Sequence, residues 1–367
     1  MHLNAFTDLY ESAGPFASVL LEVGHQTETG AHEHELRLRA AREHLADQGA
    51  PPSIVESVSE RLREQPDGPA PAARLVVAGP DGVLHDELAH FQVDDPVATW
   101  APLPDLTDWI AHRDGAVTFV LALVDHEGGD VALYDSDVPE AQEEAAVGGE
   151  TRFVHQVPVG GWSALRYQHT TENVWARNAE AVVAEVKGHL RRGHRLVLLA
   201  GDPQSRGMVR AGLEDTEAEV VELDSGTRSE DGGDEALQQA VREALMAQAV
   251  SRRLAVAHEL RDRLGRAYAV ATGVRDVADA FVRGQVQTLV LDPTSTREQE
   301  VQLAEHPGLQ VGSVALGEDE KLRADQLLVA ASVLTDADVT VATPAALGGA
   351  SVAALLRWHQ DAEGTHP

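Results

Sequence analysis

The chain has 367 residues, which is more than one core usually organises, so two or three domains are expected. It contains no cysteine, and this excludes disulfide frameworks, zinc-thiolate sites, iron-sulfur clusters and cysteine-based catalysis. A formal net charge of -31 argues by itself against a nucleic-acid binder, although net charge says little about a local basic patch. Aromatic residues make up 4%, so the cores must rely on Val, Leu and Ala, which suits α/β layers.

The sequence carries no sign of a membrane segment. The first residues lack a basic stretch followed by an apolar one, and no run approaches the ~18 apolar residues that a membrane helix needs. We therefore expect a soluble cytoplasmic protein with no membrane partner.

The first predicted domain, residues 1–115, is an α/β domain. Residues 16–23 form an apolar stretch that predicts a strand. Helical spacing over 33–62, interrupted at 48–52, predicts two helices. Residues 74–83 then predict a hairpin through an Asp-Gly turn.

The second predicted domain covers residues 116–232. It opens with a strand-turn-strand unit over 118–134, and a long helix at about 170–190 leads into a buried strand at 195–200. This alternation of helix and strand implies a parallel or mixed sheet.

The third predicted domain covers residues 233–367. Before it, residues 214–235 carry ten carboxylates against one arginine, which indicates that this stretch contains a solvated connection between domains. Its predicted elements are a long helix and a further α/β unit, at residues 233–263, 268–271, 274–283, 288–292, 326–334, 339–341 and 352–358.

Residues 159–167 read Val-Gly-Gly-Trp-Ser-Ala-Leu-Arg-Tyr and precede the helix of the second domain. Adjacent glycines allow positive φ and a close approach of the backbone to a ligand, and Ser163 could cap the segment that follows. Taken alone, a Gly-Gly turn of this kind is more often a plain loop than a site.

This stretch resembles the Gly-Gly-Gln loop of the archaeo-eukaryotic peptide-chain release factors, which continues Ser-x-x-Arg-Phe before a long helix. Gly160, Gly161, Ser163 and Arg166 match that pattern, and Tyr167 is a conservative match. The hairpin before the loop and the strand after the helix follow the order of the family's middle domain.

Trp162 stands where the family has its glutamine. In the family, that glutamine helps to position the water that attacks the peptidyl-tRNA ester. An indole offers one N–H donor and no acceptor, so it cannot reproduce the contacts of the amide. We therefore predict no catalytic residue and the loss of hydrolysis. Trp162 is either an exposed residue that stacks on a base or one folded back onto its own domain.

The resemblance extends to the third domain at 273–291 and 349–358, and so covers roughly residues 116–358. It implies an RNase H-like middle domain and an L7Ae-like C-terminal domain. Residues 168–172 and 14–19 resemble a bacterial branch related to a ribosome hibernation factor that enters the vacant A site together with elongation factor Tu. The stop-codon motif Asn-Ile-Lys-Ser is absent, so codon-dependent termination is not expected.

The resemblance implies a loop that binds the ribosome and flanking side chains that contact rRNA. The loop residues are Gly160, Gly161, Trp162, Ser163, Arg166 and Tyr167. The candidate rRNA contacts are His155, His169, Arg177, Arg191 and Arg192. The alternative for these histidines and arginines is an ordinary solvated surface.

Two other patterns in the sequence have simple structural interpretations. His32-Glu-His34 is the densest histidine cluster, but its spacing does not place both imidazoles on one helical face, so no metal is predicted and solvated side chains are expected. Gly201-Asp-Pro lacks the glycines and the lysine of phosphate-binding loops and is predicted to be a plain strand-to-helix turn. No cofactor is expected.

The leading hypothesis is a release-factor homologue without the catalytic glutamine that binds the ribosomal A site in hibernation or stress protection. Its expected partners are rRNA, ribosomal proteins and elongation factor Tu, with no DNA. One alternative is a rescue factor that still hydrolyses peptidyl-tRNA through His155, His169 or the loop backbone. The other is a soluble adaptor that no longer binds the ribosome, which the charge of -31 favours.

Overall fold

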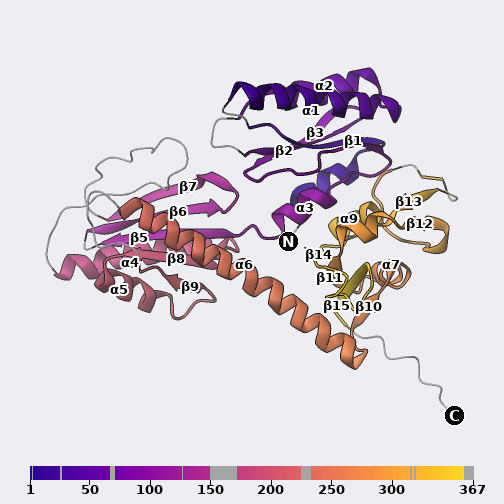
Figure 1. Ribbon diagram of the computed structural model, residues 1–367. Coiled ribbons are helices and arrows are strands. Elements are labelled where there is room, and N and C mark those ends of the chain that lie inside the picture. The colour runs from indigo at the N-terminus through magenta and orange to yellow at the C-terminus, as the bar shows by residue number, and fades with distance from the viewer. Residues whose placement is uncertain are drawn as a thin grey trace, which may run out of the picture. The chain divides into compact units, whose positions relative to one another are not determined.

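The structure is a computed structural model (Figure 1). It describes residues 1, 3–24, 27–66, 71–125, 127–148, 172–224, 233–314, 316–317 and 320–358. Two compact units are present: residues 1–115 with 252–367, and residues 116–251. The α/β fold class is confirmed, while the predicted division into three domains stays a prediction. No helix in the described ranges has the length and apolar content that a membrane crossing requires.

The N-terminal part of the first unit is an antiparallel sheet of order β3-β2-β1-β4 with helices on it. The predicted strand, helix pair and hairpin are confirmed. The elements are η1 (Asn4–Glu11), β1 (Phe16–Glu22), α1 (Glu28–Asp47), α2 (Pro52–Arg63), β2 (Ala73–Gly79), β3 (Gly82–Ala89), β4 (Val97–Ala101) and α3 (Thr107–Arg113).

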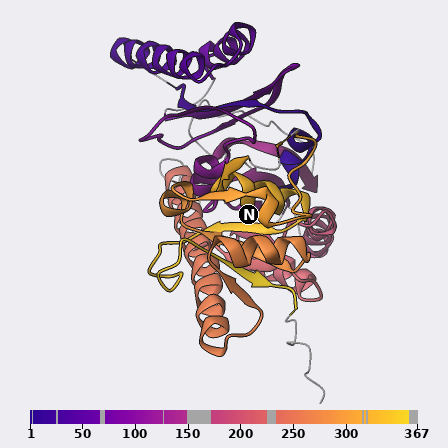
Figure 2. The same ribbon diagram turned by 90° about the vertical axis from the view of Figure 1, so that its right-hand side faces the viewer.

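Both faces of this sheet are covered. Val19 and Leu21 point to one face, where they pack with the apolar sides of α1 and α2, and Leu20 points to the other. Figures 1 and 2 show the two helices over a single face of the sheet. Burial on both sides explains why β1 is an almost continuous apolar run rather than an alternating one.

The C-terminal part of the first unit is a second sheet, of order β10-β15-β11-β14, in which β15 runs antiparallel to both neighbours and β11 and β14 are parallel. Its elements are β10 (Val270–Thr272), α7 (Val274–Val282), β11 (Val286–Leu291), α8 (Pro293–Arg297), β12 (Glu300–Gln302), η2 (Leu303–Glu305), β13 (Lys321–Arg323), α9 (Ala324–Leu334), β14 (Asp338–Val341) and β15 (Val352–Leu356).

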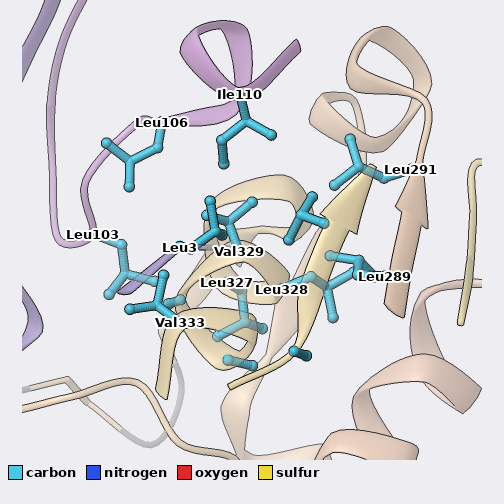
Figure 3. Close-up of a cluster of buried hydrophobic side chains, with 14 of the residues drawn as sticks. Leu3, Leu103, Leu106, Ile110, Leu289, Leu291, Leu327, Leu328, Val329 and Val333 are labelled. Atoms are coloured by element: carbon cyan, nitrogen blue, oxygen red, sulfur yellow. The ribbon is translucent and has the colours of Figure 1, made fainter. Parts of the chain in front are cut away.

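One apolar core joins the two ends of the chain. Leu3, Leu106 and Ile110 pack in the same cluster as Leu289 and Leu328 (Figure 3). Helix α9 lies in this cluster and is buried along nearly its whole length, which accounts for a sequence that is apolar on every side. The shared core is the reason why residues 1–115 and 252–367 form one unit.

The second unit is a mixed sheet of order β7-β6-β5-β8-β9. Strands β5, β6 and β7 are antiparallel, whereas β8 and β9 run parallel to β5. The mixed sheet predicted from the sequence is confirmed. The elements are β5 (Thr118–Asp125), β6 (Gly128–Asp135), β7 (Val138–Gly148), α4 (Glu172–Arg191), β8 (Leu196–Gly201), α5 (Pro203–Leu213), β9 (Glu219–Glu222) and α6 (Gly233–Arg266).

Helices cover both faces of this sheet. Val182 and Val186 of α4 and Val209 of α5 are buried against one face. Leu237 and Val241, from the first turns of α6, are buried against the other. The acidic stretch 214–235 was expected to be a solvated connection, but it also supplies the edge strand β9, whose parallel pairing with β8 no local pattern signals.

Candidate functional site

The predicted ribosome-binding loop lies outside the described residues, which stop at residue 148 and resume at 172. The same holds for two of the candidate rRNA contacts. The residues concerned are Gly160, Gly161, Trp162, Ser163, Arg166, Tyr167, His155 and His169. The structure does describe the two elements that carry the ends of this segment, strand β7 and helix α4.

Helix α4 lies close on the hairpin that precedes the loop. A Cβ atom at Gly129 of β6 would stand 2.9 Å from the Leu123 carbonyl oxygen and 2.9 Å from Cγ2 of Val182. Glycine at this position therefore allows the helix to approach the strand. The absence of a side chain at Gly129 therefore sets the distance between α4 and β6.

The C-terminal end of α4 is tied to β7, the strand on the other side of the loop segment. Arg192 donates to Oε2 of Glu143 at 2.6 Å and lies 2.7 Å from Nδ1 of the buried His189. Burial lowers the pKa of His189, and the positive charge of Arg192 lowers it further. The neutral imidazole is thus the form that this site stabilises.

The cations around α4 are largely engaged with carboxylates. Lys187 donates to Asp215 at 2.9 Å, and Arg195 lies 3.1 Å from Glu217. With the pair of Arg192 and Glu143, three of these cations already have acidic partners. Arg177 and Arg191 are exposed on the same helix.

The turn after β8 is the predicted strand-to-helix turn. Gly201 has φ of 109°, and a Cβ there would lie within 1.9 Å of the Val124 carbonyl oxygen, so no other residue fits without a backbone shift. Asp202 then caps α5 by accepting a hydrogen bond from the Ser205 amide at 2.9 Å. The carboxylate occupies the place where a phosphate would have to bind.

Residues 118–266, which include this sheet, α4 and the loop segment, match the family model described as bacterial archaeo-eukaryotic release factor family 2. Over these residues the chain is release-factor-like. The match covers the second unit from residue 118 onwards and the whole of α6, and it agrees with the resemblance seen in residues 159–167.

Two Mycobacterium tuberculosis proteins, the uncharacterized proteins MT2704 and Rv2629, are similar to this release-factor-like chain over most of its length. Each is 29% identical over 301 residues, which is 77% of this chain and 76% of the relative. Neither name states an activity.

Solved structures of similar fold include a ribosome-bound archaeal Pelota with ABCE1, Dom34 of S. cerevisiae and Pelota of Archaeoglobus fulgidus. The first has a TM-score of 0.41 at 15% identity and covers 97% of this chain and 94% of that one. Dom34 has a TM-score of 0.41 at 10% identity, over 79% and 81%. The A. fulgidus protein has a TM-score of 0.30 at 14% identity, over 79% and 80%.

The histidine pair near the N-terminus corrects one expectation. His32 is exposed, but His34 is buried, and its Nδ1 lies 3.2 Å from the Glu22 carbonyl oxygen. The expectation that both are solvated was wrong for His34, because α1 packs over the end of β1. In the described ranges no three His, Cys, Asp or Glu side chains are grouped to hold a metal.

A buried ionic cluster in the first unit has no counterpart in the sequence analysis. Arg323 bridges Asp105, at 2.7 Å, and Asp325, whose carboxylates are 1% and 0% exposed. Thr107 donates to Asp325 at 3.0 Å, and Arg297 donates to Asp108 at 2.6 Å. The Arg-x-Asp spacing at 323–325 was the sole local signal, since Asp105 and Thr107 lie 218 positions from their partners in this pair.

Proposed function

We propose that this protein is a ribosome-associated translation factor of the release-factor type that occupies the A site without hydrolysing peptidyl-tRNA. Hibernation or protection of idle ribosomes is the role that fits such occupancy. The observation that carries the proposal is Trp162, at the glutamine position of a loop inside the residues that match the family model.

The loss of hydrolysis follows from the chemistry of the two side chains. The glutamine amide both donates and accepts hydrogen bonds, whereas the indole of Trp162 only donates one. An attacking water needs an acceptor to orient it, and a general base must lie within hydrogen-bond reach of its proton. A tryptophan in this place favours binding over catalysis, with elongation factor Tu as the proposed partner in delivery.

Ion pairing around α4 favours a second candidate, a soluble adaptor that does not bind the ribosome. Lys187, Arg192 and Arg195 are already bound to carboxylates, and each pair would have to exchange its partner for a phosphate. The net charge of -31 adds a long-range repulsion from rRNA.

The test of A-site occupancy is co-sedimentation of the protein with vacant 70S ribosomes, with and without elongation factor Tu, over a series of salt concentrations. Gly160→Val combined with Gly161→Val removes the positive φ angles open to the loop. Gly207→Val is the matched control, because a Cβ at Gly207 meets nothing within 4 Å.

We expect the wild type and the Gly207 variant to sediment with ribosomes and the double variant to stay in the supernatant. Binding should weaken with salt, as contacts with phosphates require. If the wild type does not sediment with ribosomes at any salt concentration or with either nucleotide state of elongation factor Tu, A-site occupancy is refuted. The soluble adaptor is then the function that the observations support.

A peptide-release assay separates binding from hydrolysis. Stalled ribosomes carrying labelled peptidyl-tRNA should release no more peptide with the wild type than with buffer, although the protein binds. Release at the rate of a true release factor would reject the non-catalytic proposal and support the rescue enzyme. The Trp162→Gln variant then tests whether a glutamine at this position is sufficient to restore peptide release.

A further inference from the structure

A hollow of about 270 Å³ opens at one end of the C-terminal sheet, in the first unit. Its lining residues come from the last turn of α6, the residues around the start of β10 and those around the end of β15. These three elements are labelled in Figure 1. Its lining comprises Asp262, Arg263, Arg266, Tyr268, Ala269, Leu356, Arg357 and Trp358. Three arginines and one aspartate line the hollow, and Glu259, outside the lining, pairs with Arg263. Three guanidinium groups thus stand against two carboxylates, the reverse of the charge balance of the whole chain.

Two aromatic side chains stand at this hollow. Tyr268 is 55% exposed and Trp358 is 50% exposed, and they are the only aromatic residues among the exposed large hydrophobics of the described ranges. The chain has few aromatics, and its other described ones are largely buried. Half-exposed aromatic faces beside cations are the usual composition of a platform for planar, negatively charged ligands.

The backbone that presents Tyr268 is strained. Ala267 and Ala269, on either side, have φ of 49° and 50°, in the left-handed region that residues other than glycine rarely adopt. The Tyr268 amide donates to the Arg263 carbonyl at 3.1 Å, and the Leu356 amide donates to the Ala269 carbonyl at 2.9 Å. These bonds fix the tyrosine against β15, and strain held in this way often marks a binding site.

The arginines divide into fixed and accessible groups. Arg263 donates to the carbonyls of Ala269 at 3.0 Å and Leu356 at 2.8 Å and to the carboxylate of Glu259 at 2.5 Å, which fixes its guanidinium in the wall and neutralises its charge. Arg357 donates to the carbonyls of Thr335 at 3.1 Å and Asp336 at 2.8 Å. Because these backbone oxygens carry no formal charge, they do not neutralise the positive charge of Arg357.

Arg266 is the accessible cation. Its side chain is 75% exposed, and its pairing with Asp262 is long, at 3.4 Å, between two exposed groups. Exposed pairs of this kind contribute little free energy, so a phosphate can displace the carboxylate at small cost.

We propose that this hollow binds a nucleotide of single-stranded RNA, with the base stacked on Tyr268 or Trp358 and the phosphate held by Arg266 and Arg357. A base stacks on aromatic rings without sequence preference. The inference goes beyond the proposed function, since it concerns residues 262–358 and requires neither the loop nor a ribosome.

The chemistry favours RNA over an acidic peptide. A peptide carboxylate needs the arginines but gains little from two aromatic faces, whereas a nucleotide uses both kinds of group at once.

Fluorescence anisotropy of a short labelled single-stranded RNA, titrated with the full-length protein, tests the proposal. Trp358→Ala and Tyr268→Ala should each raise Kd by about tenfold through lost stacking. Arg266→Ala should raise Kd and flatten its salt dependence. Trp358→Phe keeps an aromatic face and should retain most of the binding.

Two matched controls separate the site from general effects. Leu254→Ala truncates an apolar side chain that is 52% exposed, and Arg275→Ala removes an arginine whose side chain is 73% exposed and paired with Glu305. Both should bind RNA like the wild type. Equal thermal midpoints for all variants establish that each is folded.

The proposal is overturned if the wild type does not bind the RNA, or if all the variants bind it with the affinity of the wild type. A labelled acidic peptide that binds, and is lost in the Trp358→Ala and Arg266→Ala variants while RNA is not bound, would assign the hollow to a protein partner instead. Sedimentation with ribosomes is a separate readout, so either proposal can fail without the other.

Discussion

Replacing Arg323 by methionine measures what the buried ionic cluster contributes to the first unit. Methionine keeps the apolar stem and removes the charge that lies between Asp105 and Asp325. Both oxygens of the Asp105 carboxylate accept from Arg323, at 2.7 and 3.4 Å. In the variant these bonds are lost, although the carboxylate stays buried.

The size of the effect follows from the partners that remain. Breaking a buried ion pair by removing one member costs roughly 3–5 kcal/mol, because the other charge is left uncompensated. Asp325 keeps Thr107, at 3.0 Å, and Arg297, at 3.7 Å. Because Arg323 is itself 27% exposed, we expect the lower end of that range, about 3 kcal/mol.

The loss should depend on pH in a definite direction. Burial raises the pKa of Asp105, and the guanidinium of Arg323 lowers it, so the variant has the higher pKa of the two proteins. A carboxyl whose pKa is raised in the folded state favours folding below its unfolded value, and this contribution is lost as pH rises through the folded pKa. The variant should therefore be most destabilised near neutral pH and recover relative to the wild type in acid.

Urea unfolding followed by tryptophan fluorescence measures this difference, since Trp109 is buried in the same core. Arg275→Met is the matched control, an exposed pair with Glu305 that should change stability by less than about 1 kcal/mol. Adding Asp105→Asn to Arg323→Met should recover part of the loss. Equal losses for the Arg323 and Arg275 variants, or no recovery in the double variant, would refute the reasoning.

Three further predictions use the same unfolding measurement. Gly129→Ala should destabilise the second unit by about 1–3 kcal/mol, because its Cβ meets Val182 and a carbonyl at 2.9 Å, and an unchanged midpoint would contradict the tight contact with α4. Ala267→Gly should stabilise the first unit by about 1 kcal/mol by relieving φ of 49°, so a loss of stability would show that no strain is present. Burial lowers the pKa of His189 below 6.5, so its contribution to stability is present above pH 6.5 and is lost as pH falls through the folded pKa. The His189→Gln variant should show a weaker dependence of stability on pH, and a pH profile identical to that of the wild type would exclude the histidine as its source.

Local patterns were sufficient for most of the elements. The helix pair over 28–63 and the hairpin of β2 and β3 follow from spacing and turn residues, which depend on near neighbours in the chain. The departure at Trp162 is likewise a fact of sequence, and it carries the proposed function without any coordinates.

Long-range pairing decided the rest, because no local period reports which distant segments meet. Leu3 shares a core with Leu328, and that contact makes the two ends of the chain one unit. Tyr268 and Trp358 lie far apart in sequence and reach the same hollow only because β10 and β15 are neighbours in the sheet. His34 is buried because α1 packs over β1. The sequence by itself determined the helices, the strands and the altered loop. The hollow and the ionic cluster exist only once the sheets have formed, since each consists of residues that are distant in sequence and become neighbours in the fold.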